Sequence, residues 1–403
     1  MNFRLPLTTN LLGKEEISAA KAALDSGLLT MGKLCEQFER EFAKYNGVDH
    51  AVMVNSGSSA NLLALFALAN PLLAAKGGRR RLGPGDEVIV PALSWSTSIW
   101  PVMQVGATPV FVDCDPETLQ LTPEAIEAAI TPKTAAIVVV HVLGGACNVA
   151  DIAALAEKRG LWLMEDTCES LGVLWDGRKV GTFGDLGTFS FYFSHHITTI
   201  EGGMVVTNDA QLADLLRSMR SHGWARGMSN AADIERQNPD IDPRFLFVTT
   251  GFNLRPTEIN AAIGLEQLKR LEGFNARRRK IAERFDRGFA GLHQSGELQL
   301  VRSDPRCQPA PFGYPVLCKT PDTRRNFRQH LEAAGVETRP IICGNMVRQP
   351  AFKHLPHRVS GRLDGADQVM DRGIYWGPHP GTADADIDTV IGIVKSFFDH
   401  GGR

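Results

Sequence analysis

Two consecutive histidines, His195 and His196, lie in the segment SFYFSHHITTIEGG, between a hydrophobic run and a glycine pair. Histidine changes its protonation state near neutral pH, so such a pair is typical of an acid/base catalyst, a metal site or a polar turn. Adjacent side chains on a strand point to opposite faces. No carboxylate or histidine accompanies the pair at the spacing of metal ligands. A metal site is therefore the least favoured interpretation.

Another hydrophobic run ends with two carboxylates at the start of the segment EDTCES, which contains Asp166 and Glu169. Burying an unpaired carboxylate is costly, so we expect either a cationic partner or a capping role in the turn that follows. One suitable cation is the protonated pyridine nitrogen of pyridoxal phosphate, whose ring acts as an electron sink. The residues alone leave both interpretations open.

Three further segments offer groups suited to a planar, anionic ligand. NSGSSANLLALFAL starts a helix at Gly57 and Ser58, whose N–H groups suit a phosphate, unless a serine there is only a helix cap. Trp95 follows the run DEVIVP and either stacks on a ring or packs in the core. Asn253 and Arg255, in GFNLRPTEINAAIG, either reach an anion or hold the turn before a helix.

The overall composition is that of an ordinary globular protein. The chain has 403 residues, 43% of them hydrophobic and 22% charged, which allows two or three domains of about 100–200 residues each. A net charge of −2 gives no reason to expect a nucleic acid or a membrane surface as partner. The sequence has no secretory signal and no apolar run of membrane-spanning length. Its seven dispersed cysteines indicate reduced thiols in the cytoplasm and no structural zinc site.

Short hydrophobic runs alternate with helical patterns in the first two-thirds of the chain. The runs are HAVMVN, DEVIVP, TPVFVD, AAIVVVHV, LWLMEDT, LGTFSFY and GGMVVTN. The helical patterns between them are SSANLLALFALANPLLA, TPEAIEAAI and DIAALAEKRG. This alternation predicts an α/β fold with a mostly parallel central sheet flanked by helices. Ligands in such folds bind at the carboxyl ends of the strands, where the candidate residues lie.

The remaining sequence predicts a different organisation. Residues 226–245 are polar and are expected to form a long loop, whereas residues 256–292 are expected to form two successive helices. From about residue 300 the composition indicates a smaller α+β domain. We therefore predict an N-terminal arm over residues 1–30, a large domain carrying the candidate site over 31–270 and a small C-terminal domain over 271–403.

The order of these segments resembles the DegT/DnrJ/EryC1/StrS sugar aminotransferase family, which has the type I fold of pyridoxal-phosphate enzymes. The resemblance covers nearly the whole chain and rests on NSGSSAN, PALSW, EDTCESLG, GDLGTFSFY, EGGMVVT, RSHGW, GFNLRPTEINAAIG and GVETRP. It implies that the large domain binds the cofactor. It also implies that Gly57, Ser58 and Ser190 hold the cofactor phosphate. Asn253 is implied to reach the phosphate of the neighbouring subunit, so a homodimer with shared active sites is expected.

The resemblance also assigns roles around the cofactor ring. It implies that Trp95 stacks on the pyridine, that Asp166 pairs with its nitrogen, and that Glu169 lies near its 3-hydroxyl. Three residues are expected to contact the nucleotide sugar or glutamate, with a structural or surface role as the competing interpretation: His222, Arg339 and Arg348.

The departure from the family pattern lies at the double histidine. The aminotransferases have a lysine here that binds pyridoxal phosphate covalently, whereas this chain has Ser194-His195-His196, with His195 in the place of the lysine. An imidazole cannot form this covalent bond but can move protons near neutral pH. The exchange resembles a branch of the family, the 3-dehydratases of nucleotide-linked 4-keto-6-deoxyhexoses, which use non-covalently bound pyridoxamine phosphate. His196 is expected to be a supporting residue.

The resemblance to this branch implies a reaction. His195 would move a proton at the C4′ carbon of the cofactor and assist the loss of water from sugar C3. The product would be a 3,6-dideoxy-4-keto sugar destined for a cell-surface polysaccharide such as a lipopolysaccharide O-antigen. The nucleotide, GDP, CDP or another, is not indicated by the sequence.

Two types of this branch differ in how the cofactor is restored. One uses L-glutamate, and the other carries a [2Fe–2S] cluster held by cysteines. Residues 221–245 contain no cysteine, which favours the glutamate type without a cluster. FLFVTTGFNLRP and GNMVRQPAF nevertheless resemble the cluster-bearing CDP-sugar type, which stays open as a second interpretation. Two rival functions also stay open: a pyridoxal-phosphate-dependent nucleotide-sugar 4-aminotransferase with an unexpected lysine, and a non-catalytic sugar-nucleotide binder.

Overall fold

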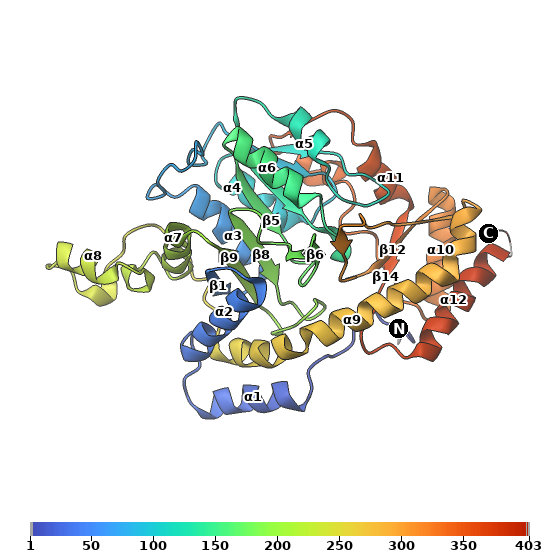
Figure 1. The fold of residues 1–403 in the computed structure, drawn as a ribbon, viewed down its shortest axis with the longest axis horizontal. Coiled ribbons are helices and arrows are strands. Elements are labelled where there is room, and N and C mark those ends of the chain that lie inside the picture. The colour runs from blue at the N-terminus through green and yellow to red at the C-terminus, as the bar shows by residue number, and fades with distance from the viewer. Residues whose placement is uncertain (1–2, 400, 402–403) are drawn as a thin grey trace.

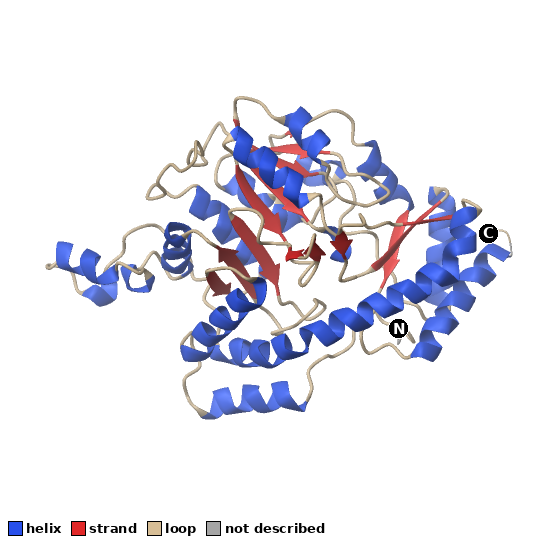
Figure 2. Ribbon diagram, in the orientation of Figure 1, coloured by secondary structure: helices blue, strands red, loops and turns tan. Residues whose placement is uncertain are grey.

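An eight-stranded sheet forms the centre of the molecule in the computed structural model, which describes residues 3–399 and 401 (Figures 1 and 2). Its strand order is β1-β9-β8-β5-β4-β2-β3-β13. The strands are β1 (His50–Val54), β2 (Glu87–Pro91), β3 (Thr108–Val112), β4 (Thr134–Val140), β5 (Trp162–Asp166), β8 (Leu186–Ser190), β9 (Gly203–Thr207) and β13 (Arg358–Val359). Strand β9 is antiparallel to both neighbours and the other pairs are parallel. The predicted α/β fold with a mostly parallel sheet is confirmed.

Helices cover both faces of this sheet because alternate strand residues point to opposite sides. Even-numbered residues of β1, such as Val52, belong to the core under α3 (Gly57–Leu68) and α7 (Ala210–Arg220). Odd-numbered residues, such as Met53, pack on the other face against α2 (Lys33–Asn46) and α9 (Glu258–Gln294). The same face continues under α5 (Pro123–Ala129) and α6 (Val149–Arg159). The continuous apolar strands are explained by burial on both sides.

The C-terminal part has a second hydrophobic core. Strands β10 (Leu298–Leu300), β12 (Tyr314–Cys318) and β14 (Gly373–Trp376) form an antiparallel sheet. Helices α10 (Pro321–Ala333), α11 (Asp364–Arg372) and α12 (Asp384–Asp399) belong to this part. Of the other helices, α1 (Lys14–Asp25) packs on α9, α4 (Trp100–Gln104) packs on α3 and β3, and α8 (Ala231–Gln237) follows α7. A small sheet contains β6 (Leu174–Trp175), β7 (Arg178–Lys179) and β11 (Cys307–Gln308). No helix in the described part of the chain is long and apolar enough to cross a membrane.

Two expectations about secondary structure were wrong. In place of two helices the structure has one, α9, which begins at Glu258 after the capping residue Thr257 and ends at Gln294. It runs from the large sheet to the C-terminal part (Figure 1). Its glycines do not end it because each costs only about 1 kcal/mol in a packed helix. The polar segment 226–245 contains the short helix α8, which projects from the body (Figure 1). The predicted domain boundary after residue 270 falls inside α9, and the division into domains stays a prediction.

Candidate active site

A cavity of about 480 Å³ opens at the carboxyl ends of β5 and β8, beside the N-terminus of α3. It is lined by seven of the candidate residues: Gly57, Ser58, Trp95, Asp166, Glu169, Ser190 and His195. The sheet brings them together because parallel strands end at the same edge. Asn61 and Ser98 also line the cavity, and neither was a candidate from the sequence. The one polar side chain inside the apolar helix pattern of residues 60–68 was a signal for Asn61.

The N-terminus of α3 forms the anion-binding end of the cavity. Ser56 caps the helix, its hydroxyl accepting a hydrogen bond from the Ser59 N–H at 3.0 Å. The first N–H groups of a helix, here of Gly57 and Ser58, have no partner within the helix and carry the positive end of its dipole. A Cβ atom on Gly57 would lie 2.4 Å from the Cβ of Ser190, so only glycine allows this close approach. The arrangement suits a phosphate.

Asp166 lies at the end of β5 with its carboxylate held by three donors. Oδ2 accepts hydrogen bonds from Asn61 Nδ2 at 2.8 Å and Ser98 Oγ at 2.6 Å, and Oδ1 accepts one from the Cys168 N–H at 3.1 Å. The Thr188 hydroxyl donates to Asn61 Oδ1 at 2.6 Å, which fixes the orientation of that amide. These three donors fix the direction of the carboxylate.

Glu169 is the second carboxyl group of the cavity and is half-buried. Its Oε2 accepts a hydrogen bond from the Leu143 N–H at 2.9 Å. Burial, assisted by the charge of Asp166, raises the pKa of Glu169 to about 7, although the Leu143 N–H acts in the opposite direction. The cavity thus combines one carboxyl group held by three donors with one that exchanges a proton near neutral pH.

Glu169→Gln is expected to change the pH dependence of stability of the cofactor-free protein. Because the pKa is raised from 4.5 to about 7 by folding, the contribution of this group to stability is complete below about pH 4.5 and is lost as the pH rises through 7. The glutamine variant should lack this loss, which we expect to be about 1–3 kcal/mol. Urea unfolding at pH 5 and pH 8 measures it, with exposed Glu15→Gln as the control. An unchanged pH slope in Glu169→Gln would contradict the raised pKa.

His195 lies in a turn beyond β8, with its N–H donating to the Tyr192 carbonyl at 3.0 Å. Its ring packs against Phe312 at a centroid distance of 5.1 Å. Burial lowers the pKa of His195 to about 4, against the opposing effects of the Cys168 main chain and Asp166. Nδ1 is buried and has no hydrogen-bond partner among the described residues. A neutral imidazole with a free nitrogen can accept a proton.

His196 differs from its neighbour in its polar contacts. It is 1% exposed, and its Nε2 donates a hydrogen bond to the Ala310 carbonyl at 2.8 Å. Burial lowers the pKa of His196 well below its ordinary value. Strand β8 ends at Ser190, and both histidines lie in the bend after the following turn, so the strand alternation expected from the sequence does not apply to them. These contacts support a structural role for His196, which stays a prediction.

Four candidate residues do not line the cavity of this chain. Asn253 is exposed in a separate groove with Trp224, Arg226 and Arg255. The ring of His222 packs against the ring of Trp224, with 5.0 Å between the ring centroids. The other two are arginines that form ion pairs, Arg339 with Glu337 and Arg348 with Asp367 and Asp371. The main chain of Arg339 nevertheless pairs with Tyr375, a cavity residue. Their roles stay predictions.

The residues of the cavity fit pyridoxal or pyridoxamine phosphate bound without a covalent link. The helix N-terminus suits the phosphate, the fixed Asp166 carboxylate suits a pyridinium nitrogen, and Trp95, 55% exposed, offers a ring face. Among the described residues, no lysine lines the cavity. Lys179 lies elsewhere, on β7, where its Nζ donates to the Tyr45 carbonyl at 2.5 Å.

The chain is similar to known proteins over nearly its whole length. The model of the DegT/DnrJ/EryC1/StrS aminotransferase family matches residues 10–395. A GDP-4-keto-6-deoxy-D-mannose 3-dehydratase of Yersinia pseudotuberculosis is 38% identical over 401 residues, which are 98% of each chain. The structure of the E. coli GDP-4-keto-6-deoxy-D-mannose-3-dehydratase with bound hydrated PLP has a TM-score of 0.90 at 35% identity, covering 98% of this chain and 100% of that one. A GDP-4-keto-6-deoxymannose-3-dehydratase with a trapped PLP-glutamate geminal diamine has a TM-score of 0.87 at 35% identity, with 97% and 100% covered.

Proposed function

The chain belongs to the DegT/DnrJ/EryC1/StrS aminotransferase family, and we propose that it removes the C3 hydroxyl of a GDP-linked 4-keto-6-deoxyhexose. It is a 3-dehydratase dependent on pyridoxal or pyridoxamine phosphate. The observation that carries the proposal is His195, a half-buried neutral imidazole that lines the cavity where the aminotransferases have their lysine. We propose GDP as the nucleotide because the similar enzymes are named as acting on a GDP-linked sugar.

The residues of the cavity divide the work of binding. Bound pyridoxamine phosphate supplies an amine that condenses with the C4 ketone of the sugar and a pyridinium ring that withdraws electrons. Gly57, Ser58 and Ser190 bind the phosphate, and Trp95 covers one face of the ring. Asp166 holds the proton on the ring nitrogen and thereby maintains the electron sink. These assignments are supported by the positions of the side chains around one cavity.

His195 is the proton carrier of the proposed reaction. In its neutral form it accepts the proton released at C4′ of the cofactor. The imidazolium then donates this proton to the hydroxyl group leaving C3, so water departs and the residue returns to its neutral state. His195 lines the cavity whereas His196 does not, which supports this role for His195. Hydrolysis then releases ammonia and the 3,6-dideoxy-4-keto sugar; pyridoxamine phosphate would supply the nitrogen and the two electrons and would be left as pyridoxal phosphate.

L-glutamate is proposed as the amino donor that restores pyridoxamine phosphate, leaving 2-oxoglutarate. A similar enzyme has been trapped with a PLP-glutamate adduct, which supports this choice. His222, Arg339 and Arg348 are the proposed contacts to the sugar nucleotide or to the glutamate carboxylates. We also propose a cytoplasmic enzyme, in keeping with its seven free thiols.

Two protomers are proposed to share the active sites. Asn253 does not line the cavity of its own chain, and the segment leading to it exposes Phe245 and Phe247. Trp95 and Tyr192 at the cavity are likewise exposed. Mixing inactive Asp166→Asn protein with inactive Asn253→Ala protein should restore part of the activity, because each hybrid dimer then has one intact site. No recovery in a verified hybrid would contradict shared sites.

One incubation tests the proposed function directly. The purified protein is mixed with pyridoxamine phosphate, L-glutamate and GDP-4-keto-6-deoxymannose, and the products are analysed by mass. We expect a sugar lighter by one oxygen atom and formation of 2-oxoglutarate. A 4-amino sugar as the only product would instead support an aminotransferase. Turnover of a CDP- or dTDP-linked sugar alone would correct the nucleotide.

Gly57→Ala is expected to disturb the phosphate-binding end of the cavity. The added Cβ would meet Ser190 at 2.4 Å, so either α3 or β8 must shift, at a cost of about 1–3 kcal/mol. We expect binding of pyridoxal phosphate to weaken about tenfold or more, measured by absorbance titration. Gly273→Ala in α9, where nothing lies within 4 Å, is the control and should bind normally. Normal binding by Gly57→Ala would exclude this phosphate site.

A further inference from the structure

His141 and Glu165 form a fully buried pair on the face of the sheet opposite the cavity; both are 0% exposed. In the parallel pairing of β4 and β5, Val139 lies beside Glu165 and Val140 beside Asp166. Because side chains alternate, Val140 and Asp166 line the cavity while Glu165 points the other way. His141 follows Val140 and reaches Glu165 on that far side.

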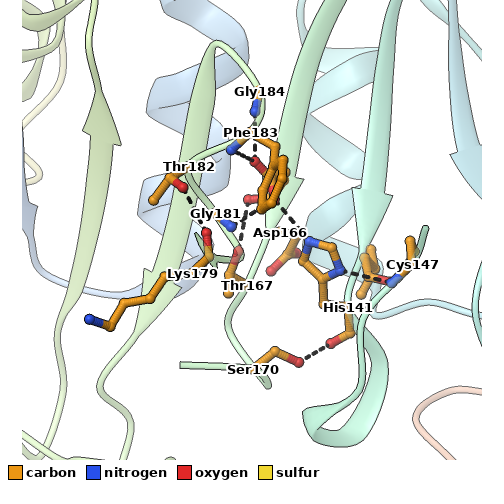
Figure 3. Close-up of polar contacts among 12 residues, drawn as sticks. His141, Cys147, Asp166, Thr167, Ser170, Lys179, Gly181, Thr182, Phe183 and Gly184 are labelled. Carbon is orange, nitrogen blue, oxygen red and sulfur yellow. Dashed lines mark hydrogen bonds and ion pairs between the residues drawn. The ribbon is translucent and has the colours of Figure 1, made fainter. Parts of the chain in front are cut away.

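The Glu165 carboxylate accepts four hydrogen bonds. Three come from the N–H groups of Gly181, Phe183 and Gly184, each at 2.7 Å, and one from His141 Nε2 at 3.1 Å (Figure 3). Four donors thus satisfy the buried carboxylate, and within the described part of the chain none of them is a lysine or an arginine. The turn at 181–184 leads into β8, which ends at Ser190. Glu165 therefore ties the strand of Asp166 to the strand of Ser190.

His141 connects this carboxylate to two further segments. Its Nδ1 accepts a hydrogen bond from the Cys147 N–H at 3.1 Å, so the ring proton is on Nε2, where it is donated to Glu165 (Figure 3). Its main-chain N–H donates to the Asp166 carbonyl at 3.0 Å, and its carbonyl accepts from Ser170 Oγ at 2.8 Å. The ring and the main chain thus bind both sides of the segment that carries the cavity carboxylates.

The loop between His141 and Cys147 holds Glu169. Leu143 in this loop has a φ of 51°, a conformation that leucine rarely adopts, and its N–H donates to Glu169 at 2.9 Å. The bond from the Cys147 N–H to the His141 ring closes the base of the loop. An unusual backbone conformation persists only where its surroundings enforce it. His141 is one of the groups that enforce it here.

We propose that His141 and Glu165 are a positioning pair for the two cavity carboxylates, setting Asp166 through the main chain of β5 and Glu169 through the loop at Leu143. Neither His141 nor Glu165 lines the cavity, so neither residue is catalytic. The inference rests on the proposed function, since it concerns residues that would contact the cofactor ring. It adds that the placement of the cavity carboxylates requires a residue pair on the opposite face of the sheet.

Two amide variants separate the hydrogen bonds of His141. In His141→Gln the amide nitrogen reaches the position of Nε2 and keeps the donor to Glu165. In His141→Asn the shorter amide cannot reach Glu165. We expect His141→Asn to weaken binding of pyridoxal phosphate about tenfold and to lower kcat more than it raises KM. The pH midpoint of the absorbance change of the bound cofactor should also move by about one pH unit. His141→Gln should recover most of the binding.

The control is His330→Asn, which removes the hydrogen bond of His330 to the Ile393 carbonyl in the C-terminal part. It should lower the melting temperature without changing cofactor affinity or absorbance. The positioning role is overturned if His141→Asn binds like the parent protein, or if its cofactor affinity and absorbance change no more than those of His330→Asn at equal loss of stability. If His141→Asn does not fold, Glu165→Gln is measured in the same way. A parent protein that binds no pyridoxal phosphate would instead refute the proposed function.

Discussion

His195→Asn is expected to lower kcat for dehydration by about 10²–10⁴-fold, the usual contribution of a general acid/base residue. Burial lowers the pKa of His195 to about 4, so the parent enzyme holds a neutral proton acceptor throughout the range from pH 5 to pH 8. Asparagine keeps a polar side chain of similar position but cannot carry the proton to the C3 hydroxyl. Binding of pyridoxal phosphate should be nearly unchanged, because the phosphate and ring contacts remain.

Two further variants test whether the effect of His195→Asn comes from the loss of proton transfer. His195→Lys should lose dehydration as well but is expected to form the 4-amino sugar, since a primary amine can bind the cofactor covalently. His196→Asn loses the hydrogen bond to the Ala310 carbonyl and should cost stability while keeping the dehydration product. Product masses and melting temperatures distinguish the three. A His195→Asn protein that dehydrates as fast as its parent would show that another group carries the proton.

The strands and the cavity were predictable because their signals are local. Each apolar run between turn residues became a strand, and parallel strands must end at one edge, so Asp166, Ser190 and the start of α3 had to meet there. The place of His195 was predictable only through the resemblance to a family. Its turn conformation was not, because residues 190–196 have the composition of a strand.

The residues that hold the cavity carboxylates in place were not predictable, because their hydrogen bonds join distant parts of the chain. Ser98 and Asn61 both bind Asp166, yet one lies in a 3₁₀ turn after β2 and the other in α3. Glu165 is the first residue of EDTCES, but its role was hidden because its four donors come from a turn and a loop that no local pattern brings together. The single helix α9 was missed for the opposite reason. The local pattern did not show whether one helix or two would form, because packing along the whole length of α9 decides this.

Asp166→Asn is expected to lower the rate of dehydration and the affinity for pyridoxamine phosphate by about 2–5 kcal/mol in total, the usual cost of removing one partner of a buried charge pair. This is a factor of roughly 30 to 5,000. The carboxylate now accepts from Asn61, Ser98 and the Cys168 N–H, and an amide nitrogen would turn one of these contacts into two opposed donors. It would also remove the charge that keeps the proton on the ring nitrogen. The absorbance of the bound cofactor should therefore titrate at lower pH.

The control for Asp166→Asn is the same substitution at Asp185, beside the opposite end of β8. Asp185 accepts the Leu163 N–H at 2.9 Å, and burial raises the pKa of this carboxyl group, so an uncharged amide is a milder change there. Asp185→Asn should bind the cofactor with an unchanged spectrum, whatever its effect on the melting temperature. Asp166→Asn and Asp185→Asn proteins with equal affinity and equal spectra would exclude Asp166 as the partner of the ring nitrogen. Since Asp166 and His195 act at different atoms, combining Asp166→Asn with His195→Asn should cost no more than the sum of the two.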